Sequence, residues 1–247
     1  MQVVAHRGAS AALPEHTPAA YRRAIADGVG AVECDVRLTV DGHLVCLHDR
    51  RVDRTSNGRG VVSQLTLAEL RQLDWGRWGR WQGGEPAGLL TARELFELVA
   101  GVDRRVEIAV ETKHPSQPGG RVEQALASLL SEFGWADASS PVRMMSFSVL
   151  AVRRMHRLTP AVPLVFLLDR SRPPYGDGAL PVGVGCAGIS VEMLRRDPDY
   201  VARARARGNA VHVWTVDEPE DVVRCVNAGV EAIITNRPRE VLAQLGR

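Results

Sequence analysis

The feature that most constrains the fold is an alternation along the chain between short apolar segments, rich in β-branched residues, and longer segments with helical periodicity. This alternation is typical of parallel α/β sheets and barrels, in which each helix connects two parallel strands. When one hairpin is counted as a single unit, the sequence contains eight strand units, the number in a (β/α)8 or TIM barrel. The predicted strands span residues 3–5, 31–37 with 44–48, 106–111, 142–146, 164–168, 188–191, 210–216 and 232–235. A length of 247 residues fits one such barrel or two small domains, and the strand count favours a single α/β domain over residues 1–247.

The second strand unit is predicted to be an antiparallel hairpin. Its two arms are separated by the turn sequence Asp41-Gly42, and so short a connection cannot make a parallel crossover. With the turn centred between Val40 and Asp41, Glu33 is expected to lie opposite His48. The hairpin would then bring an acidic and a basic side chain together.

Residues from about 49 to 89 interrupt the alternation. They are rich in arginine and glycine, contain Trp75, Trp78 and Trp81, and show one helical segment at residues 66–73. Since this stretch supplies no strand of the barrel, we predict a small inserted cap that follows the second strand unit and covers one mouth of the barrel.

Three carboxylates are predicted to face the lumen of the barrel. Glu33 and Asp35 alternate with the apolar residues Cys34 and Val36, and Glu111 ends the strand at 106–111. The apolar face of a barrel strand packs against the helices, so the carboxylates point inward. Inward carboxylates repel one another unless a cation lies among them, and their oxygens are the ligands that Mg²⁺ and Ca²⁺ prefer. The pattern predicts one divalent cation, Mg²⁺ or Ca²⁺, bound by these three residues.

Two histidines and two cationic side chains are expected at the same mouth, because active sites of such barrels lie at the carboxyl ends of the strands. His6 and Arg7 end the first strand, His48 ends the hairpin and Lys113 follows the third strand unit. The histidines can act as a general base and a general acid near neutral pH, and the cations can hold a phosphate group. Lys113 is the only lysine among 31 lysines and arginines. A compact ammonium is not interchangeable with a planar guanidinium, so its retention in an arginine-rich chain indicates a functional position.

The remaining composition excludes several classes of function. A formal net charge of +2 without a basic run gives no indication of nucleic-acid binding. The four cysteines have neither metal-ligand nor C-x-x-C spacing and are expected to be free, buried thiols in a reducing compartment. The N-terminus lacks the pattern of a signal peptide, and no apolar segment is long enough to span a bilayer, so we expect a cytoplasmic protein without stable membrane insertion. The G-x-G-x-x-G sequence at residues 183–188 leads into a predicted strand rather than a helix, which argues against a dinucleotide site.

These residues lie within motifs that resemble the glycerophosphodiester phosphodiesterase family of bacterial, cytoplasmic type. The resemblance covers nearly the whole chain. It rests on A-H-R-G at residues 5–8, L-P-E-H-T at 13–17, E-C-D-V at 33–36, T-V-D-G at 39–42, L-H-D at 47–49, E-T-K at 111–113, S-F at 146–147, V-W-T-V at 213–216 and I-T-N-R-P at 234–238.

The resemblance implies a (β/α)8 barrel with a cap after the His-Asp element, a cation held by the three carboxylates, acid–base catalysis by the two histidines and phosphate binding by Arg7 and Lys113. It also implies that Glu15 lies near the metal and the substrate. Trp214 ends a predicted strand and is expected to wall the substrate pocket. The family usually has an asparagine where this chain has His16, a change that concerns the hydrogen bonding of its loop more than the chemistry.

The predicted reaction is metal-dependent hydrolysis of a glycerophosphodiester to glycerol 3-phosphate and an alcohol. His6 is expected to accept a proton from the nucleophile and His48 to donate one to the leaving oxygen, although the sequence leaves the reverse assignment open. It also leaves open whether water or a neighbouring glycerol hydroxyl attacks. The expected partner is a small-molecule diester, and the protein is expected to be a monomer or a homodimer.

Two alternatives stay open from the residues. A lysophospholipase D-like enzyme acting on lysolipids requires a hydrophobic rim, for which the cap tryptophans are the one indication. A non-catalytic phosphate-binding barrel is disfavoured, because the chain retains the complete set of acids, histidines and lysine.

Overall fold

Eight parallel strands close into a barrel in the part of the chain that the structure describes. The computed structural model describes residues 1–82, 84, 86–115, 119–170 and 174–247. Closure occurs at β1, which pairs with both β9 and β2. The parallel strands are β1 (Gln2–His6), β2 (Ala31–Leu38), β4 (Glu107–Thr112), β5 (Val142–Ser146), β6 (Leu164–Leu168), β7 (Cys186–Ser190), β8 (Ala210–Trp214) and β9 (Ala232–Thr235). The predicted (β/α)8 fold is confirmed.

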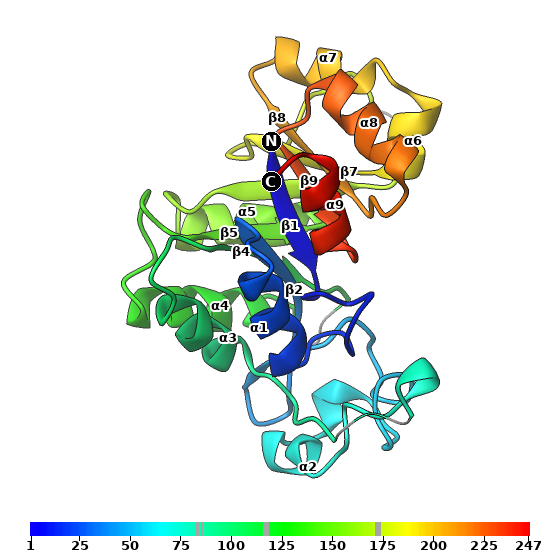
Figure 1. Ribbon diagram of the computed structural model, residues 1–247. Helices are drawn as coiled ribbons and strands as arrows, with labels where there is room; N and C mark the ends of the chain where they lie inside the picture. Colours follow the sequence, from blue (N-terminus) through cyan, green and yellow to red (C-terminus); the bar gives the residue numbers. More distant parts are fainter. Residues whose placement is uncertain (83, 85, 116–118, 171–173) are drawn as a thin grey trace.

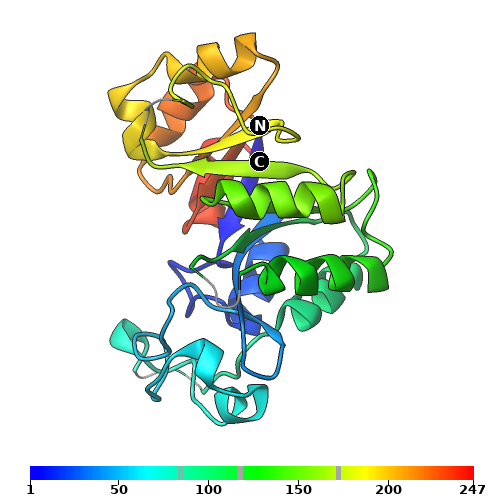
Figure 2. The same cartoon turned by 180° about the vertical axis from the view of Figure 1, so that it is seen from behind.

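The main helices lie on the outside of the barrel, between successive strands (Figures 1 and 2). They are α1 (Pro18–Ala26), α3 (Ala92–Ala100), α4 (Arg121–Glu132), α5 (Val149–Leu158), α6 (Val191–Arg196), α7 (Tyr200–Ala206), α8 (Pro219–Ala228) and α9 (Pro238–Gln244). Several begin at a hydroxyl residue, such as Thr17 or Ser148, whose side chain accepts a hydrogen bond from a backbone N–H of the first turn. The short helices α6 and α9 were not predicted; each follows directly or nearly directly on a strand, β7 or β9, with no loop sequence to mark its start.

The apolar side chains of the strands form two layers, one outside the barrel and one in its lumen. Outward residues of β2, such as Cys34 and Val36, join the large core between the barrel and the helices. The lumen is filled by Val4, Ala31, Ala109, Met145, Val165, Leu167, Cys186, Ala232 and Ile234. Since Glu33 and Asp35 alternate with the outward residues, they face the lumen, as predicted.

The predicted hairpin forms between β2 and β3 (Leu44–Cys46), but its register differs from the prediction by one residue. Val36 lies opposite Cys46, so the prediction that Glu33 lies opposite His48 was wrong. The physical reason is the turn. Gly42 adopts a left-handed conformation with φ 88° and closes a three-residue loop, which shifts the centre of the hairpin onto residue 41.

The segment between β3 and α3 forms the predicted cap, which lies beyond the carboxyl ends of β1 and β2 (Figure 1). It contains the 3₁₀ turns η1 (Val62–Gln64) and η2 (Gly79–Trp81) and the helix α2 (Leu67–Arg71). Its own small core consists of Val45, Leu47, Val52, Val62, Leu70, Trp75 and Leu89. Arg80 binds the carbonyl oxygens of Ser10 and Ala11 and so ties the cap to the loop after β1. The assignment of the whole chain to one domain stays a prediction.

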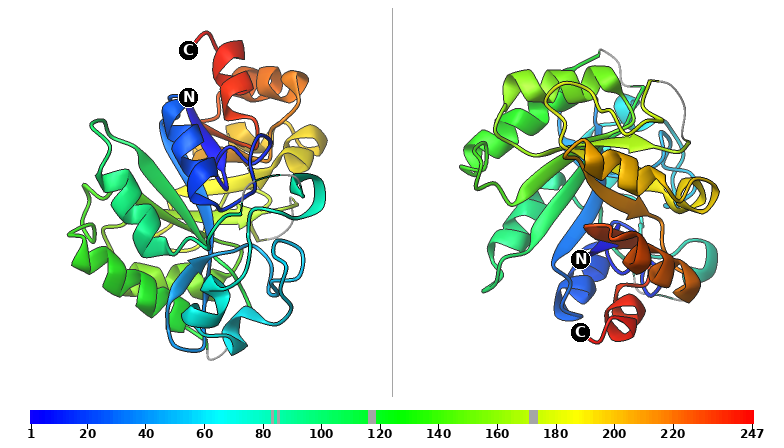
Figure 3. Two further views of the ribbon diagram at one scale, coloured as in Figure 1. Left: turned by 60° about the horizontal axis from the view of Figure 1, so that its bottom comes forward. Right: turned by 90° about the horizontal axis from the view of Figure 1, so that it is seen from above.

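The two chain termini lie close together on the barrel (Figures 1 and 3). The Arg247 guanidinium donates a hydrogen bond to the Met1 carbonyl at 2.8 Å. Among the described residues, no helix combines the length and the apolar character that crossing a membrane requires.

Candidate active site

Three buried carboxylates meet inside the mouth of the barrel. Glu33, Asp35 and Glu111 are 2%, 1% and 8% exposed, and each offers an oxygen within 4.8 Å of the other two. The pairing of β2 with β4 sets this arrangement, because it places Asp35 directly beside Glu111. The sequence predicted this convergence, and the structure contains it.

The carboxylates carry opposed pKa shifts. Burial raises the pKa of Glu33 well above its usual value, and the charge of Asp35 adds to the rise. Burial and Asp35 likewise raise the pKa of Glu111 to about 7. Burial also acts to raise the pKa of Asp35, but the nearby Arg7 charge and a hydrogen bond from His16 hold it well below its usual value. Asp35 is thus the most readily ionised carboxylate of the cluster, and its charge disfavours ionisation of Glu33 and Glu111.

Two cations flank the carboxylates. Lys113 Nζ lies 2.8 Å from Glu111 Oε1 and 3.0 Å from Asp35 Oδ1. Arg7 Nε lies 3.0 Å from Asp35 Oδ2, and the Arg7 backbone N–H donates to Glu33 Oε2 at 3.0 Å. Despite these neighbours, Asp35 Oδ1 is buried without a hydrogen bond of regular geometry. This oxygen therefore retains capacity for a further ligand.

A tight turn after β1 positions Arg7. Arg7 has φ 57° and Gly8 has φ 81°, both in the left-handed region. A side chain at Gly8 would come within 2.7 Å of the Ala20 backbone in α1, so only glycine allows this close approach. The contact between the turn and α1 thus explains why the A-H-R-G motif ends in glycine.

His6 belongs to a hydrogen-bonded chain that crosses the mouth. Its Nδ1 lies 2.7 Å from Asn236 Oδ1, and the Asn236 amide nitrogen donates to Asp217 at 2.6 Å. Because Asp217 requires the amide nitrogen, the amide oxygen faces His6, and Nδ1 carries the proton. The other ring nitrogen, Nε2, is then an acceptor and lies 4.0 Å from Glu33 Oε2. Burial and the charge of Arg7 lower the pKa of His6 to about 4.

The partners of His6 were not predicted. Asn236 lies within the I-T-N-R-P motif, and Asp217 directly follows V-W-T-V. The sequence does not show that His6 and Asn236 are in contact, because 230 positions separate the two bonded residues.

His48 lies at the rim and is less buried than His6. Its Nδ1 lies 2.7 Å from Asp49 Oδ1, and its side chain is 37% exposed. Burial and the charges of Arg7 and Lys113 lower its pKa, while Asp35 and the Asp49 hydrogen bond act in the opposite direction. Asp49 is held in turn by Arg54, a residue that sequence reasoning missed.

Comparison with known proteins supports this arrangement. Residues 6–240 match the model of the glycerophosphoryl diester phosphodiesterase family. The chain belongs to this family. The predicted resemblance is therefore confirmed, and with it the prediction of a phosphoric diester hydrolase.

Individual relatives align over nearly their full length. The protein named "Probable glycerophosphodiester phosphodiesterase 1" of Mycobacterium tuberculosis is 48% identical over 98% of this chain and 92% of its own length. A glycerophosphodiester phosphodiesterase of Caldanaerobacter subterraneus is 33% identical over 97% of this chain and 96% of its own. The solved structure of an Oleispira antarctica phosphodiesterase in complex with the product sn-glycerol-3-phosphate superposes with a TM-score of 0.90, at 25% identity, over 100% of this chain and 97% of its own.

In this phosphodiesterase, Glu15 is bound by two guanidiniums. Arg7 and Arg54 contact it at 3.1 and 2.8 Å. Burial acts to raise the pKa of Glu15, but the hydrogen bonds from Arg54 and the charge of Arg7 lower it to about 2. Glu15 thus fixes Arg7 over the carboxylates, and Arg54 links it to Asp49.

His16, which replaces the usual asparagine of the motif, is buried behind the carboxylates. Its Nε2 lies 3.0 Å from Asp35 Oδ2, and its Nδ1 lies 2.8 Å from the Tyr21 hydroxyl. Because an ionised carboxylate only accepts, the His16 Nε2–H donates to Asp35. With histidine at this position, Asp35 therefore still accepts a hydrogen bond from residue 16.

Trp214 lies at the carboxyl end of β8. Its indole N–H donates to the Gly188 carbonyl at 2.9 Å, and its ring meets Phe147 edge-on at 5.4 Å between centroids. Phe147 follows β5, so the pair bridges two separate strands at the mouth.

The G-x-G-x-x-G sequence runs into β7 and opens no helix at its end, which agrees with the prediction that it is not a dinucleotide motif.

Proposed function

We propose that the protein hydrolyses glycerophosphodiesters to glycerol 3-phosphate and an alcohol, using one divalent cation, Mg²⁺ or Ca²⁺, at Glu33, Asp35 and Glu111. The observation that carries the proposal is the convergence of these carboxylates with Lys113 in one buried cluster. The names of the two curated relatives and the glycerol phosphate bound to the Oleispira antarctica phosphodiesterase support this substrate class.

The residues fit a hard cation. They offer three carboxylates within 4.8 Å, and Asp35 Oδ1 is buried without a regular hydrogen bond. When bound, the cation neutralises phosphate charge and stabilises the transition state. Lys113 and Arg7 contribute the protein's own positive charge and hold the phosphate oxygens from opposite sides of Asp35.

His6 is proposed as the general base. A pKa of about 4 keeps its imidazole neutral at pH 7, so that Nε2 can accept the proton of the nucleophile. Asn236 and Asp217 position the ring, because their hydrogen bonds hold the proton on Nδ1 and leave Nε2 free. His6 can accept this proton whether the nucleophile is water or a glycerol hydroxyl.

His48 is proposed as the general acid that protonates the leaving oxygen. The Asp49 carboxylate bonded to Nδ1 opposes the lowering of the His48 pKa by burial, Arg7 and Lys113, and Nε2–H is the donor of the protonated ring. The Glu15–Arg54–Asp49 chain then couples this histidine to the phosphate-binding Arg7. Trp214, with Phe147, is proposed to wall the pocket of the glycerol moiety.

The cap tryptophans do not favour the alternative of a lysolipid-cleaving enzyme. Trp75 is buried in the cap core, while Trp78 and Trp81 are half-buried and lie under Arg54 and Arg80. Trp78 and Trp81 line the depression that contains His6 and Arg7, but most of the other residues lining it are polar or charged, so the two rings do not form a continuous apolar rim. Cytoplasmic location and a monomeric or homodimeric state stay predictions.

The proposal is tested by measuring turnover of glycerophosphocholine, glycerophosphoethanolamine, glycerophosphoinositol and lysophosphatidylcholine. Each is assayed with excess chelator and after addition of Mg²⁺ or Ca²⁺. We expect cation-dependent release of glycerol 3-phosphate from the glycerophosphodiesters. Full activity in excess chelator, or cleavage of the lysolipid alone, would overturn the proposal.

A further inference from the structure

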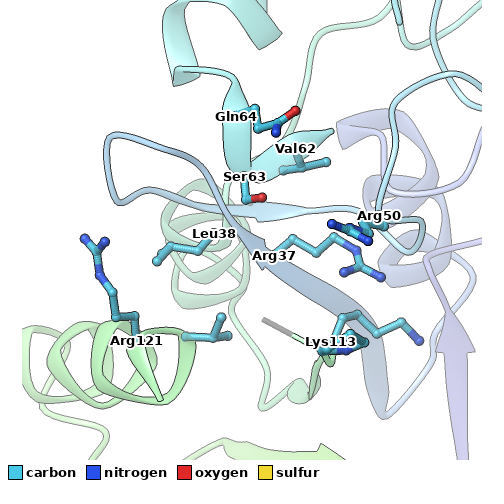
Figure 4. Close-up of a pocket in the computed structure, with 10 residues that line it drawn as sticks. Arg37, Leu38, Arg50, Val62, Ser63, Gln64, Lys113 and Arg121 are labelled. Carbon is cyan, nitrogen blue, oxygen red and sulfur yellow. The ribbon is translucent and has the colours of Figure 1, made fainter. Parts of the chain in front are cut away.

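A separate cavity of about 330 Å³ opens beside Lys113, between the hairpin, the cap turn η1 and the start of α4 (Figure 4). Four of its described lining residues are cationic and none is acidic. The lining consists of Arg37, Leu38, Arg50, Val62, Ser63, Gln64, Lys113, Pro115, Arg121 and Val122. Such a lining favours an anionic occupant.

Among the described residues, three arginines of the cavity, Arg37, Arg50 and Arg121, form no ion pair with a carboxylate. Arg37 donates to the His48 carbonyl through Nε at 2.9 Å and Nη2 at 2.7 Å, and this acceptor is a neutral group. The ends of Arg37 and Arg50 point toward one another in Figure 4. Within the described residues, neither forms an ion pair with a carboxylate, whereas Arg54 on the same loop is held by Glu15 and Asp49. Arg37 is half-buried and Arg50 is exposed, and an anion between their guanidinium groups would offset the repulsion of the two like charges.

The position of the cavity relates it to the leaving alcohol. Arg37 binds the backbone of His48, the proposed general acid, and Lys113 belongs both to the cavity lining and to the carboxylate cluster. The cavity therefore adjoins both the His48 backbone and the carboxylate cluster, so that the alcohol part of a substrate bound at His48 can extend toward Arg37 and Arg50. His6 lies on the opposite side, in a different depression with Arg7 and Asn236.

We propose that this cavity binds an anionic group on the alcohol part of the substrate, so that diesters with a phosphorylated alcohol are preferred over those with a neutral or cationic alcohol. The inference rests on the proposed function and names its substrate class. Guanidinium groups suit this task because they bind phosphate oxygens through paired N–H donors.

The test compares glycerophosphoinositol with glycerophosphoinositol 4-phosphate, two diesters that differ by one phosphate. We expect kcat/KM to be roughly tenfold or more higher for the phosphorylated diester, as one charge-assisted contact provides. Arg50→Gln should reduce this preference to near unity and leave turnover of glycerophosphoinositol unchanged. Arg153→Gln, an exposed arginine on α5 away from the cavity, is the matched control and should keep the preference.

Ser63→Glu supplies a second variant, because it adds a carboxylate to the cavity lining without removing a contact. It should reverse the preference toward the unphosphorylated diester. Equal kcat/KM for the two diesters in the wild type, or a preference that survives both variants, would overturn the inference while the proposed function stands. Failure to cleave any of the diesters overturns both together.

Discussion

Replacement of Lys113 by arginine is expected to remove most of the activity even though it preserves the charge. Lys113 Nζ lies 2.8 Å from Glu111 Oε1 and 3.0 Å from Asp35 Oδ1, and its side chain is 11% exposed. One compact ammonium thus serves the carboxylates of two neighbouring strands from a single point. A guanidinium is larger and directs its donors in a fixed planar fork, so it cannot keep both contacts without displacing a carboxylate oxygen.

The loss of one of these two charged contacts amounts to about 2 kcal/mol, which corresponds to roughly a thirtyfold fall in kcat/KM. The assay is steady-state hydrolysis of glycerophosphoinositol at saturating Mg²⁺, with thermal melting of each variant to verify folding. The matched control is Arg153→Lys, the reverse exchange at an exposed position on α5. Wild-type kcat/KM in a folded Lys113→Arg protein would refute the steric argument and leave the carboxylates and histidines as assigned.

Further predictions concern the cation and the histidines. Mg²⁺ or Ca²⁺ should raise the melting temperature of the wild type but not of Asp35→Asn, because a ligand that binds the native state alone stabilises it; an equal rise in both proteins would contradict the cation site. His48→Ala should lower kcat for glycerophosphoinositol by roughly 10²–10⁴ but far less for a nitrophenyl phosphodiester, whose leaving group needs no proton; equal losses would show that another group is the acid. Since His6 accepts a proton only when neutral and its pKa is about 4, activity should persist as the pH falls below 7 and be lost as the pH passes through about 4. The profile is measured at saturating Mg²⁺, which favours the ionised form of Glu111, and an acid limb of kcat/KM near pH 6.5 would then count against His6 as the base. Asn236→Leu should lower kcat about tenfold or more with little change in KM, and Asn236→Asp should move the acid limb to higher pH, because a carboxylate stabilises the protonated ring; an unmoved limb would exclude Asn236 as a positioning residue.

Local sequence patterns predicted most of the elements. The strands Val142–Ser146, Leu164–Leu168 and Ala232–Thr235 and the helix Val149–Leu158 were predicted to the residue. Each has its own periodicity and a capping or turn residue at its end, and both signals act over a few neighbouring positions. The inward direction of Glu33 and Asp35 followed in the same way from their alternation with apolar neighbours.

Features that depend on distant contacts or on backbone conformation escaped prediction. The hairpin register shifted by one residue because it follows the conformation of Gly42. The pairing of His6 with Asn236 and the contact of Arg54 with Glu15 join residues 230 and 39 positions apart. No local pattern indicates such partners.

The sequence by itself determined a barrel whose mouth carries three acids, two histidines and one lysine, because the two-residue period of a strand decides which side chains face inward. Tertiary structure decided the chemical state of those groups. Burial and neighbouring charges set the pKa of Glu111 at about 7 and that of His6 at about 4, and the Asn236–Asp217 pair sets the tautomer of His6. These properties arise from low-dielectric surroundings and from contacts between separate strands and loops, which exist only after the barrel has closed.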